Sequence, residues 1–175
     1  METREVKDSH SIIIADTSVL INFLAIDRLD LIERHSCRFF ITEHVRHEVT
    51  THYGEQVCRL DRAVEQGILE VIQITDPDEV ETFARWIGFE RFGEGECACI
   101  AVALHRQYRL AMDDKQAIKQ AERCHATLKI LTTQDLMCSM LQETLLTVAE
   151  ADAIKQDWAT FHRFRLKIAS FGDLL

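Results

Sequence analysis

The sequence predicts an α/β protein built on a mainly parallel central sheet that is flanked by helices. Short apolar runs alternate along the chain with helical stretches, and most of these runs are apolar on both faces. A length of 175 residues suits a single core. The chain has one proline and no Gly/Ser-rich linker or repeat, so we expect one domain over residues 1–175. Right-handed crossovers would then place helices on both faces of the sheet.

Five segments have the pattern of strands. Four of them are short and apolar on both sides, which is typical of buried strands in a parallel sheet. The third segment alternates between apolar and polar residues, so we expect it at an edge. The predicted strands are Ser11–Ala15, Arg38–Thr42, Ile68–Ile74, Tyr108–Met112 and Leu128–Leu131.

Helical patterns lie between and after these strands. Gly67 is placed to cap the fourth helix, and Thr147 and Glu150 have capping-box spacing near the start of the last. We expect the sheet core over residues 11–131 and a C-terminal helical extension over residues 132–175. The predicted helices are Thr17–Ala25, Leu29–Arg34, Glu43–Thr50, Gln56–Gln66, Asp78–Trp86, Glu94–Arg106, Lys115–His125, Thr133–Glu143 and Glu150–Arg163.

Composition excludes some classes of protein. The net charge is −9, from 20 basic and 29 acidic residues, which argues against a protein that simply coats nucleic acid. The apolar run at Ile12–Ile14 is too short for a signal peptide or a membrane span, so a cytoplasmic protein without membrane attachment is expected. Six cysteines without a CxxC pair favour buried, reduced thiols over a zinc site, and Cys97 and Cys99 lie in an apolar run.

Acidic residues recur just after the predicted strands. Asp16 directly follows the first strand, and Asp113 and Asp114 directly follow the fourth. Glu48 lies in the helix after the second strand, and Glu96 lies in the first turn of a helix of small residues. Because ligands of open α/β sheets bind outside the carboxyl ends of the strands, we expect these acids at one shared edge.

Carboxylates gathered at one edge favour a hard divalent cation. Without a cation they would repel one another and raise each other's pKa. Carboxylate oxygens suit Mg²⁺ or Mn²⁺ better than zinc or copper. Such an ion can activate water and stabilise charge on a phosphate, so the pattern predicts metal-assisted hydrolysis of phosphodiesters.

Other interpretations of these acids remain open. An Asp after a strand is often a turn or N-cap residue, and Glu94 is expected to be only a first-turn acid favoured by the helix dipole. Spacing does not separate Asp113 from Asp114. A phosphoacceptor receiver or an aspartyl-phosphate phosphatase is a different class, but a phosphatase needs DxD where the chain has DTS from Asp16.

Four motifs resemble those of PIN-domain proteins, in the same order. IIIADTSVLINFL resembles the opening strand, acid and helix, and ITEHVRHEV resembles a second motif that ends in Glu. GEGECACIAVAL and YRLAMDDKQAIKQA resemble the third and fourth motifs. The likeness covers about Ile12–Ala121, and LTTQDLMCSMLQETLLTVAEADAI is similar to the helical tail of one prokaryotic branch.

This resemblance implies a PIN-like three-layer fold and cleavage of single-stranded RNA that depends on Mg²⁺ or Mn²⁺. It implies a metal-site quartet of acids, a further acid that could replace or assist the last of them, and two hydroxyls that position water or phosphate. The quartet would be Asp16, Glu48, Glu96 and Asp114, and Asp113 would be the further acid. The two hydroxyls would be those of Thr17 and Ser18.

Many small PIN proteins are toxins of the VapC type, so a small antitoxin and a homodimer partner are expected from the resemblance. The third motif carries Glu96 where many toxins carry Asp, which fits the GEGE-bearing branch. A catalytically silent PIN-like module that binds RNA or protein is the main alternative.

The C-terminal extension is rich in basic and aromatic residues. It could contact RNA through phosphates and stacking, or it could serve for packing with a solvated outer face. Alternation over Arg163–Leu166 also allows a half-buried strand in place of a helix end.

Overall fold

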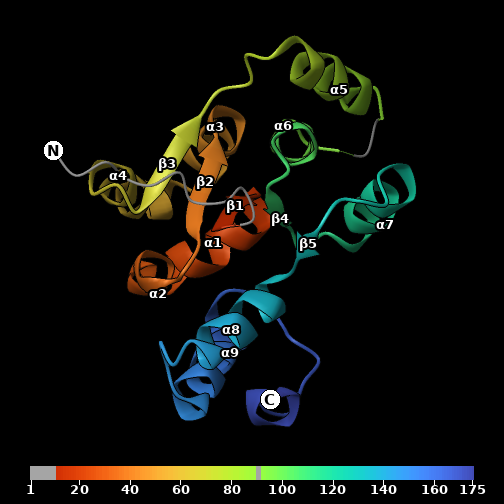
Figure 1. Ribbon diagram of the computed structural model, residues 1–175. Coiled ribbons are helices and arrows are strands. Elements are labelled where there is room, and N and C mark those ends of the chain that lie inside the picture. Colours follow the sequence, from red (N-terminus) through yellow and green to blue (C-terminus); the bar gives the residue numbers. More distant parts are fainter. Residues whose placement is uncertain (1–10, 90–91) are drawn as a thin grey trace, which may run out of the picture.

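The computed structural model describes residues 11–89 and 92–175, so residues 1–10 of the predicted domain lie outside the described residues. Its centre is a five-stranded sheet in which every pairing is parallel, as predicted. The strands are β1 (Ile12–Ala15), β2 (Arg38–Thr42), β3 (Leu69–Ile72), β4 (Arg109–Ala111) and β5 (Ile130–Leu131). They follow the order β3-β2-β1-β4-β5 (Figure 1), so the predicted edge position of β3 is confirmed.

Strand β1 lies in the middle of the sheet and all four of its residues are buried. Ile14 pairs with Phe40 of β2 on one side and with Leu110 of β4 on the other. The Asp16 backbone N–H donates to the carbonyl of Ala111 at 2.9 Å, which extends the β1–β4 pairing by one residue. The carboxyl ends of β1 and β4 are therefore side by side.

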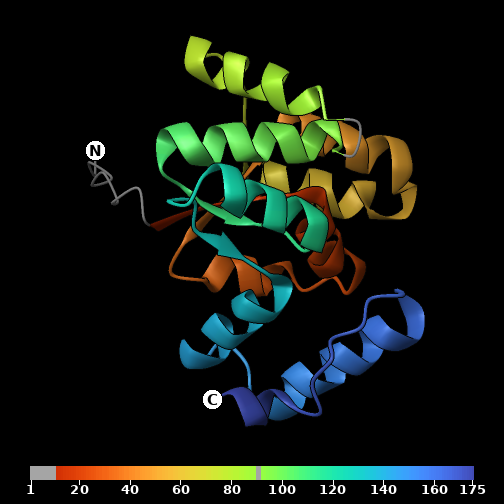
Figure 2. The ribbon, with the colours of Figure 1, turned by 90° about the vertical axis from the view of Figure 1, so that its right-hand side faces the viewer.

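Helices cover both faces of the sheet. The helices are α1 (Thr17–Ala25), α2 (Leu29–Arg34), α3 (Glu43–His52), α4 (Val57–Glu65), α5 (Pro77–Ile87), α6 (Glu94–Arg106), α7 (Lys115–Cys124), α8 (Thr133–Gln142) and α9 (Val148–Phe161), with short 3₁₀ turns η2 (Gly54–Gln56) and η3 (Phe171–Leu174). In Figures 1 and 2, α5 and α6 lie on one side of the sheet, and α2, α8 and α9 lie on the other. The predicted layered α/β architecture is confirmed.

Helix α6 packs directly on β1, β2 and β4. Its inner positions are small, with Cys97, Ala98, Cys99, Ala101 and Ala103 all buried. Small side chains let a helix backbone approach a sheet closely, and the Cys99 thiol donates to a β1 carbonyl at 3.6 Å. This packing brings the first turn of α6 to the carboxyl edge of the sheet.

The C-terminal extension is folded back on itself. Helix α9 starts at Val148, because Thr147 is its N-cap and forms a capping box with Glu150. The segment after α9 forms no strand, so the alternative of a strand at Arg163–Leu166 is wrong. The Asp152 carboxylate accepts hydrogen bonds from the Ser170 hydroxyl and from a backbone N–H, which ties this segment to α9.

All six cysteines are free thiols. Cys97 and Cys99 are buried, as predicted, whereas Cys58 and Cys124 are exposed because they lie on outward-facing positions of α4 and α7. For these last two thiols the expectation of burial was wrong. Within residues 11–89 and 92–175, none of the helices is both long enough and apolar enough to cross a membrane.

Candidate functional site

Asp16 is the N-cap of α1 at the carboxyl end of β1, and it is only 1% exposed. Its Oδ2 accepts hydrogen bonds from the Ser18 backbone N–H at 3.1 Å and from the Ser18 hydroxyl at 2.7 Å. Its Oδ1 is buried and finds no hydrogen-bond partner among the described residues. Burial raises the pKa of Asp16 to about 6, against an ordinary 3.8. One carboxylate oxygen of this side chain therefore lacks the partner that burial normally requires.

Glu48 reaches the same edge from α3. The Thr17 hydroxyl donates to its Oε2 at 2.5 Å, and the Gly95 backbone N–H donates to its Oε1 at 2.9 Å. The carboxylate thus connects α1, α3 and the start of α6. A Cβ at position 95 would lie 2.6 Å from Oε2 of Glu48, so a glycine there leaves room for this carboxylate.

Glu96 lies in the first turn of α6, where its Oε2 accepts a hydrogen bond from the Gly93 backbone N–H at 3.1 Å. Its pKa is raised to about 7, first by burial and then by the negative charges of Asp16, Asp114 and Glu48. Carboxylates that share a field in this way disfavour one another's ionised form. The four acids that the motif resemblance placed together therefore interact electrostatically across the carboxyl edge.

Asp114 is the N-cap of α7, where its Oδ1 accepts hydrogen bonds from the backbone N–H groups of Gln116 and Ala117. It is exposed at the start of that helix. Its charge contributes to the raised pKa of Glu96, so Asp114 belongs with the acidic group electrostatically while it also caps a helix.

Asp113 has different surroundings. Its carboxylate accepts from the Thr133 backbone N–H at 2.8 Å, from the Thr133 hydroxyl at 2.6 Å and from the Asn22 amide at 3.0 Å. Its backbone N–H donates to the Ser18 hydroxyl oxygen at 3.0 Å. These contacts give Asp113 a bridging position between α1 and α8.

The residues around Asp113 were not predicted from the sequence. Buried Asn22 donates to both Asp113 and the Thr133 hydroxyl, and its backbone carbonyl accepts from the Trp158 indole N–H at 2.8 Å. Partners so far apart in the chain leave no pattern of spacing, so no sequence signal identified them.

An open hollow of about 350 Å³ lies over the acids. Its lining includes five residues that the sequence had singled out and three that it had not, and these are Asp16, Thr17, Ser18, Glu48 and Glu96, then His52, Tyr53 and Gly93. Glu48 and His52 are four residues apart on α3, which puts them on one helix face and was a usable signal for His52.

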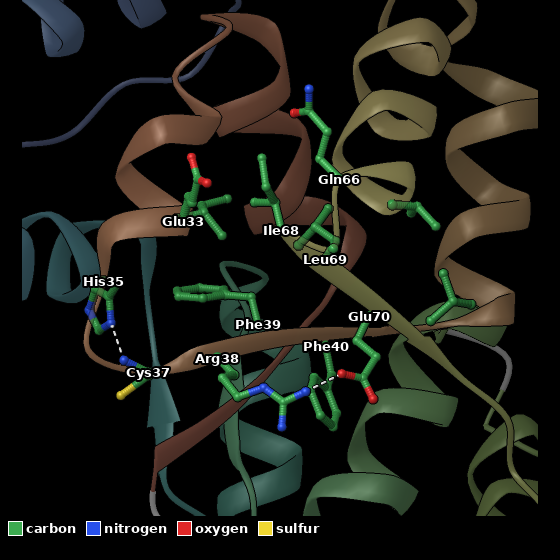
Figure 3. A pocket seen from close by; sticks show the side chains of 14 residues that line it. Glu33, His35, Cys37, Arg38, Phe39, Phe40, Gln66, Ile68, Leu69 and Glu70 are labelled. Carbon is green, nitrogen blue, oxygen red and sulfur yellow. Dashed lines mark hydrogen bonds and ion pairs between the residues drawn. The ribbon is translucent and has the colours of Figure 1, made fainter. Parts of the chain in front are cut away.

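A larger hollow of about 740 Å³ lies at the other end of the sheet, by the first residues of β2 and β3 (Figure 3). Phe39 and Leu69 form part of its wall, and Arg38 and Glu70 form an ion pair across it. Its lining contains none of the acids at the carboxyl edge. This hollow is therefore separate from the acidic group.

Within residues 11–89 and 92–175, no three His, Cys, Asp or Glu side chains lie close enough together to hold a metal ion. Donors from the protein hold one oxygen or both of each carboxylate: Ser18 for Asp16, Thr17 and Gly95 for Glu48, Gly93 for Glu96, and two α7 backbone N–H groups for Asp114. The donor chemistry nevertheless fits Mg²⁺ or Mn²⁺, because all four groups offer carboxylate oxygens and, in the part of the chain that the structure describes, nothing forms a hydrogen bond to Asp16 Oδ1.

Comparison with known proteins gave a family match and several similar solved structures. A family profile described as PIN domain matches residues 12–156. A search of curated proteins found none that matches. A PilT N-terminus domain protein from the hyperthermophilic archaeon Sulfolobus solfataricus P2 is similar in structure, with a TM-score of 0.52 and 17% identity over 75% of this chain and 94% of that one.

VapBC2 from Rickettsia felis, solved bound to a DNA fragment from its promoter, is similar at a TM-score of 0.48. The identity is 14%, over 69% of this chain and 98% of that one. The first of these two matches confirms the predicted fold.

Proposed function

The chain belongs to the PIN domain family, and from this premise we propose that it is an endoribonuclease that hydrolyses single-stranded RNA with Mg²⁺ or Mn²⁺. PIN domains are usually nucleases, which supports the reaction class. The observation that carries the proposal is Oδ1 of Asp16, which is buried without a hydrogen-bond partner among the described residues, in a group of acids whose charges act on one another.

The residues that would hold the ion are Asp16, Glu48, Glu96 and Asp114. When bound, a divalent ion lowers the pKa of water and stabilises charge on a phosphate. Ser18 orients Asp16 through two hydrogen bonds to Oδ2, and no described residue forms a hydrogen bond to Oδ1.

The other acids have roles that follow from their contacts. Thr17 and Gly95 fix the carboxylate of Glu48 from two helices. Burial and the charges of the neighbouring acids raise the pKa of Glu96, and a divalent ion bound by these carboxylates would offset that repulsion. We propose that Asp114, and not Asp113, completes the group, because three donors already bind the Asp113 carboxylate.

Regulation by an antitoxin is the finer part of this proposal. It rests on the resemblance of the four motifs to those of PIN-domain proteins, many of which are toxins of the VapC type. A short neighbouring reading frame with a DNA-binding pattern would support this role, and the homodimer stays a prediction.

The test is cleavage of an end-labelled single-stranded RNA by the purified protein. Mg²⁺ or Mn²⁺ should support cleavage, and EDTA should abolish it. Asp16→Asn should lower the rate at least about 100-fold, because it removes the charge of the most buried acid. Asp173→Asn, at an exposed acid near the C-terminus, is the matched control and should cleave like the wild type.

Two outcomes would count against the proposal. Cleavage that persists in Asp16→Asn would assign the activity to another site or to a contaminant. RNA binding without any cleavage by the wild type would favour the silent module.

A further inference from the structure

A third hollow, of about 530 Å³, lies beside the acidic group, between the start of α7 and the side chains of Phe89 and Phe92. Two aromatic rings and two primary amides line it, with one acid among them. The lining residues are Gly88, Phe89, Phe92, Asp114, Gln116, Ala117 and Gln120.

The buried ring of Trp86 packs against both of these aromatic rings. Trp86, which is only 2% exposed, contacts Phe92 edge-to-face at 5.1 Å between ring centroids and contacts Phe89 at 5.7 Å. The Phe89 and Phe92 rings also meet edge-to-face at 6.2 Å, and the Phe92 backbone N–H donates to the Phe89 carbonyl. Phe89 nevertheless stays 43% exposed. A supported ring that remains exposed offers a flat apolar surface to a partner.

We propose that this hollow binds a nucleobase of the RNA substrate, with Phe89 stacking on the base and the amides of Gln116 and Gln120 contacting its polar edge. This inference rests on the proposed ribonuclease function. Bases of single-stranded RNA commonly stack on aromatic side chains and hydrogen-bond through their exposed edges. A primary amide both donates and accepts, which matches the mixed groups on a base edge.

The charge of the hollow favours a base over a phosphate. None of the described residues that line it is basic, and Asp114 adds a negative charge. A phosphate would meet repulsion there, whereas an uncharged base would not. The Gln120 amide reaches the Cys124 sulfur at 3.5 Å, a weak contact that leaves its oxygen available.

The hollow adjoins the acidic group at Asp114. Asp114 lines the hollow, and its charge also acts on Glu96. Phe92 directly precedes Gly93, which lines the hollow over the acids. A base held by Phe89 and Phe92 would therefore leave its own sugar–phosphate near the four carboxylates, which is where cleavage is proposed to occur.

The experiment measures binding of a fluorescein-labelled single-stranded RNA by anisotropy, with Mg²⁺ present and in an Asp16→Asn background to suppress cleavage. Phe89→Ala should weaken binding about five-fold or more, the lower range for loss of one stacked base. Phe89→Tyr keeps an aromatic ring and should bind within about two-fold of the parent. Val80→Ala removes an apolar side chain that is 47% exposed on α5, and it should leave binding unchanged.

A second arm uses the same RNA with one abasic residue, moved along the sequence. At one position the abasic change should weaken binding by the parent but not by Phe89→Ala, because both changes remove the same contact. Gln120→Leu should alter the preference among A, C and U substrates without loss of the fold, which circular dichroism checks.

The outcomes separate the two proposals. Absence of RNA binding by the parent overturns the proposed function. Equal binding by the parent and Phe89→Ala overturns the base-binding hollow alone. The same holds if, at every position, the loss of affinity from the abasic residue adds to the loss from Phe89→Ala. In that case the exposed rings would suit an apolar side chain of a protein partner.

Discussion

Asp113 and Asp114 are adjacent in the chain, yet their carboxylates have different partners. Three donors from α1 and α8 bind Asp113, whereas two backbone N–H groups of α7 bind Asp114. Burial raises the pKa of Asp113, as expected for a carboxyl enclosed in the fold. Asp113 therefore connects α1 with α8, whereas Asp114 lies at the carboxyl edge of the sheet at the start of α7.

Replacement by Asn should lower the stability of the fold at Asp113 and the cleavage activity at Asp114. Asp113→Asn replaces an acceptor oxygen with an amide that cannot accept, so it should lower the free energy of unfolding by about 1–3 kcal/mol. Asp114→Asn keeps an oxygen for the α7 cap, so its stability should stay within about 0.5 kcal/mol of wild type. Cleavage should nevertheless be lost in Asp114→Asn. Urea unfolding measures the stability of the two variants, and the RNA assay measures their cleavage rates. Equal stabilities would contradict the different roles given to Asp113 and Asp114.

The sequence could not separate these two acids, for a physical reason. The rule that ligands bind at the carboxyl ends of strands places both at the edge. What distinguishes them is Asn22, 91 residues away from Asp113, and Thr133, 20 residues away. Contacts of this range depend on how helices pack, and one sequence carries no periodic signal for that packing.

The first turn of α6 and the end of α3 touch at a glycine. The Gly95 backbone donates to Glu48, and the missing Cβ leaves space for the Glu48 carboxylate. Because the nearest atoms belong to the end of a flexible side chain, a larger residue at this position would displace the acid without disturbing the backbone.

Gly95→Ala should therefore separate folding from activity. The free energy of unfolding should change by less than about 1 kcal/mol, since Ala also favours the helix. The rate of RNA cleavage should fall about ten-fold or more as Glu48 moves. Gly54→Ala, where an added Cβ meets nothing within 4 Å, is the control. Wild-type cleavage by Gly95→Ala would show that the position of Glu48 is unimportant.

Most elements could be predicted from local patterns. The predicted bounds of α1, α2, α6 and β2 agree with the structure, because local patterns of apolar residues define them. The predicted strand Leu128–Leu131 is two residues too long, since β5 comprises only Ile130–Leu131. Only these two residues pair with β4, and the sequence pattern does not show where that pairing begins. The aromatic rings of Phe89 and Phe92 were not singled out, since exposure of a ring depends on tertiary packing.

For the whole molecule, the acidic edge has a cost in stability. The pKa values of Asp16, about 6, and Glu96, about 7, lie above their ordinary values of 3.8 and 4.5. Folding therefore favours the protonated forms. Their stabilising contribution is fully present below about pH 4 and is lost as the pH rises through 6 to 7.

In EDTA, Asp16→Asn should thus gain stability relative to wild type between pH 5 and pH 8. The difference between 3.8 and about 6 corresponds to about 3 kcal/mol, which is the upper limit of the gain. Mn²⁺ should raise the stability of the wild type at pH 8 and raise that of Asp16→Asn much less. Urea unfolding at both pH values measures this. A constant difference would show that Asp16 is not charged against its surroundings.

The central place of β1 has a consequence for the growing polypeptide on the ribosome. Strand β1 pairs on one side with β2, which is synthesised soon after it. On the other side it pairs with β4, which is synthesised much later. Asp114 comes after β4 as well. A nascent chain that ends before this point lacks both the second neighbour of β1 and the last of the four acids, so the acidic group can assemble only after residue 114 has been synthesised.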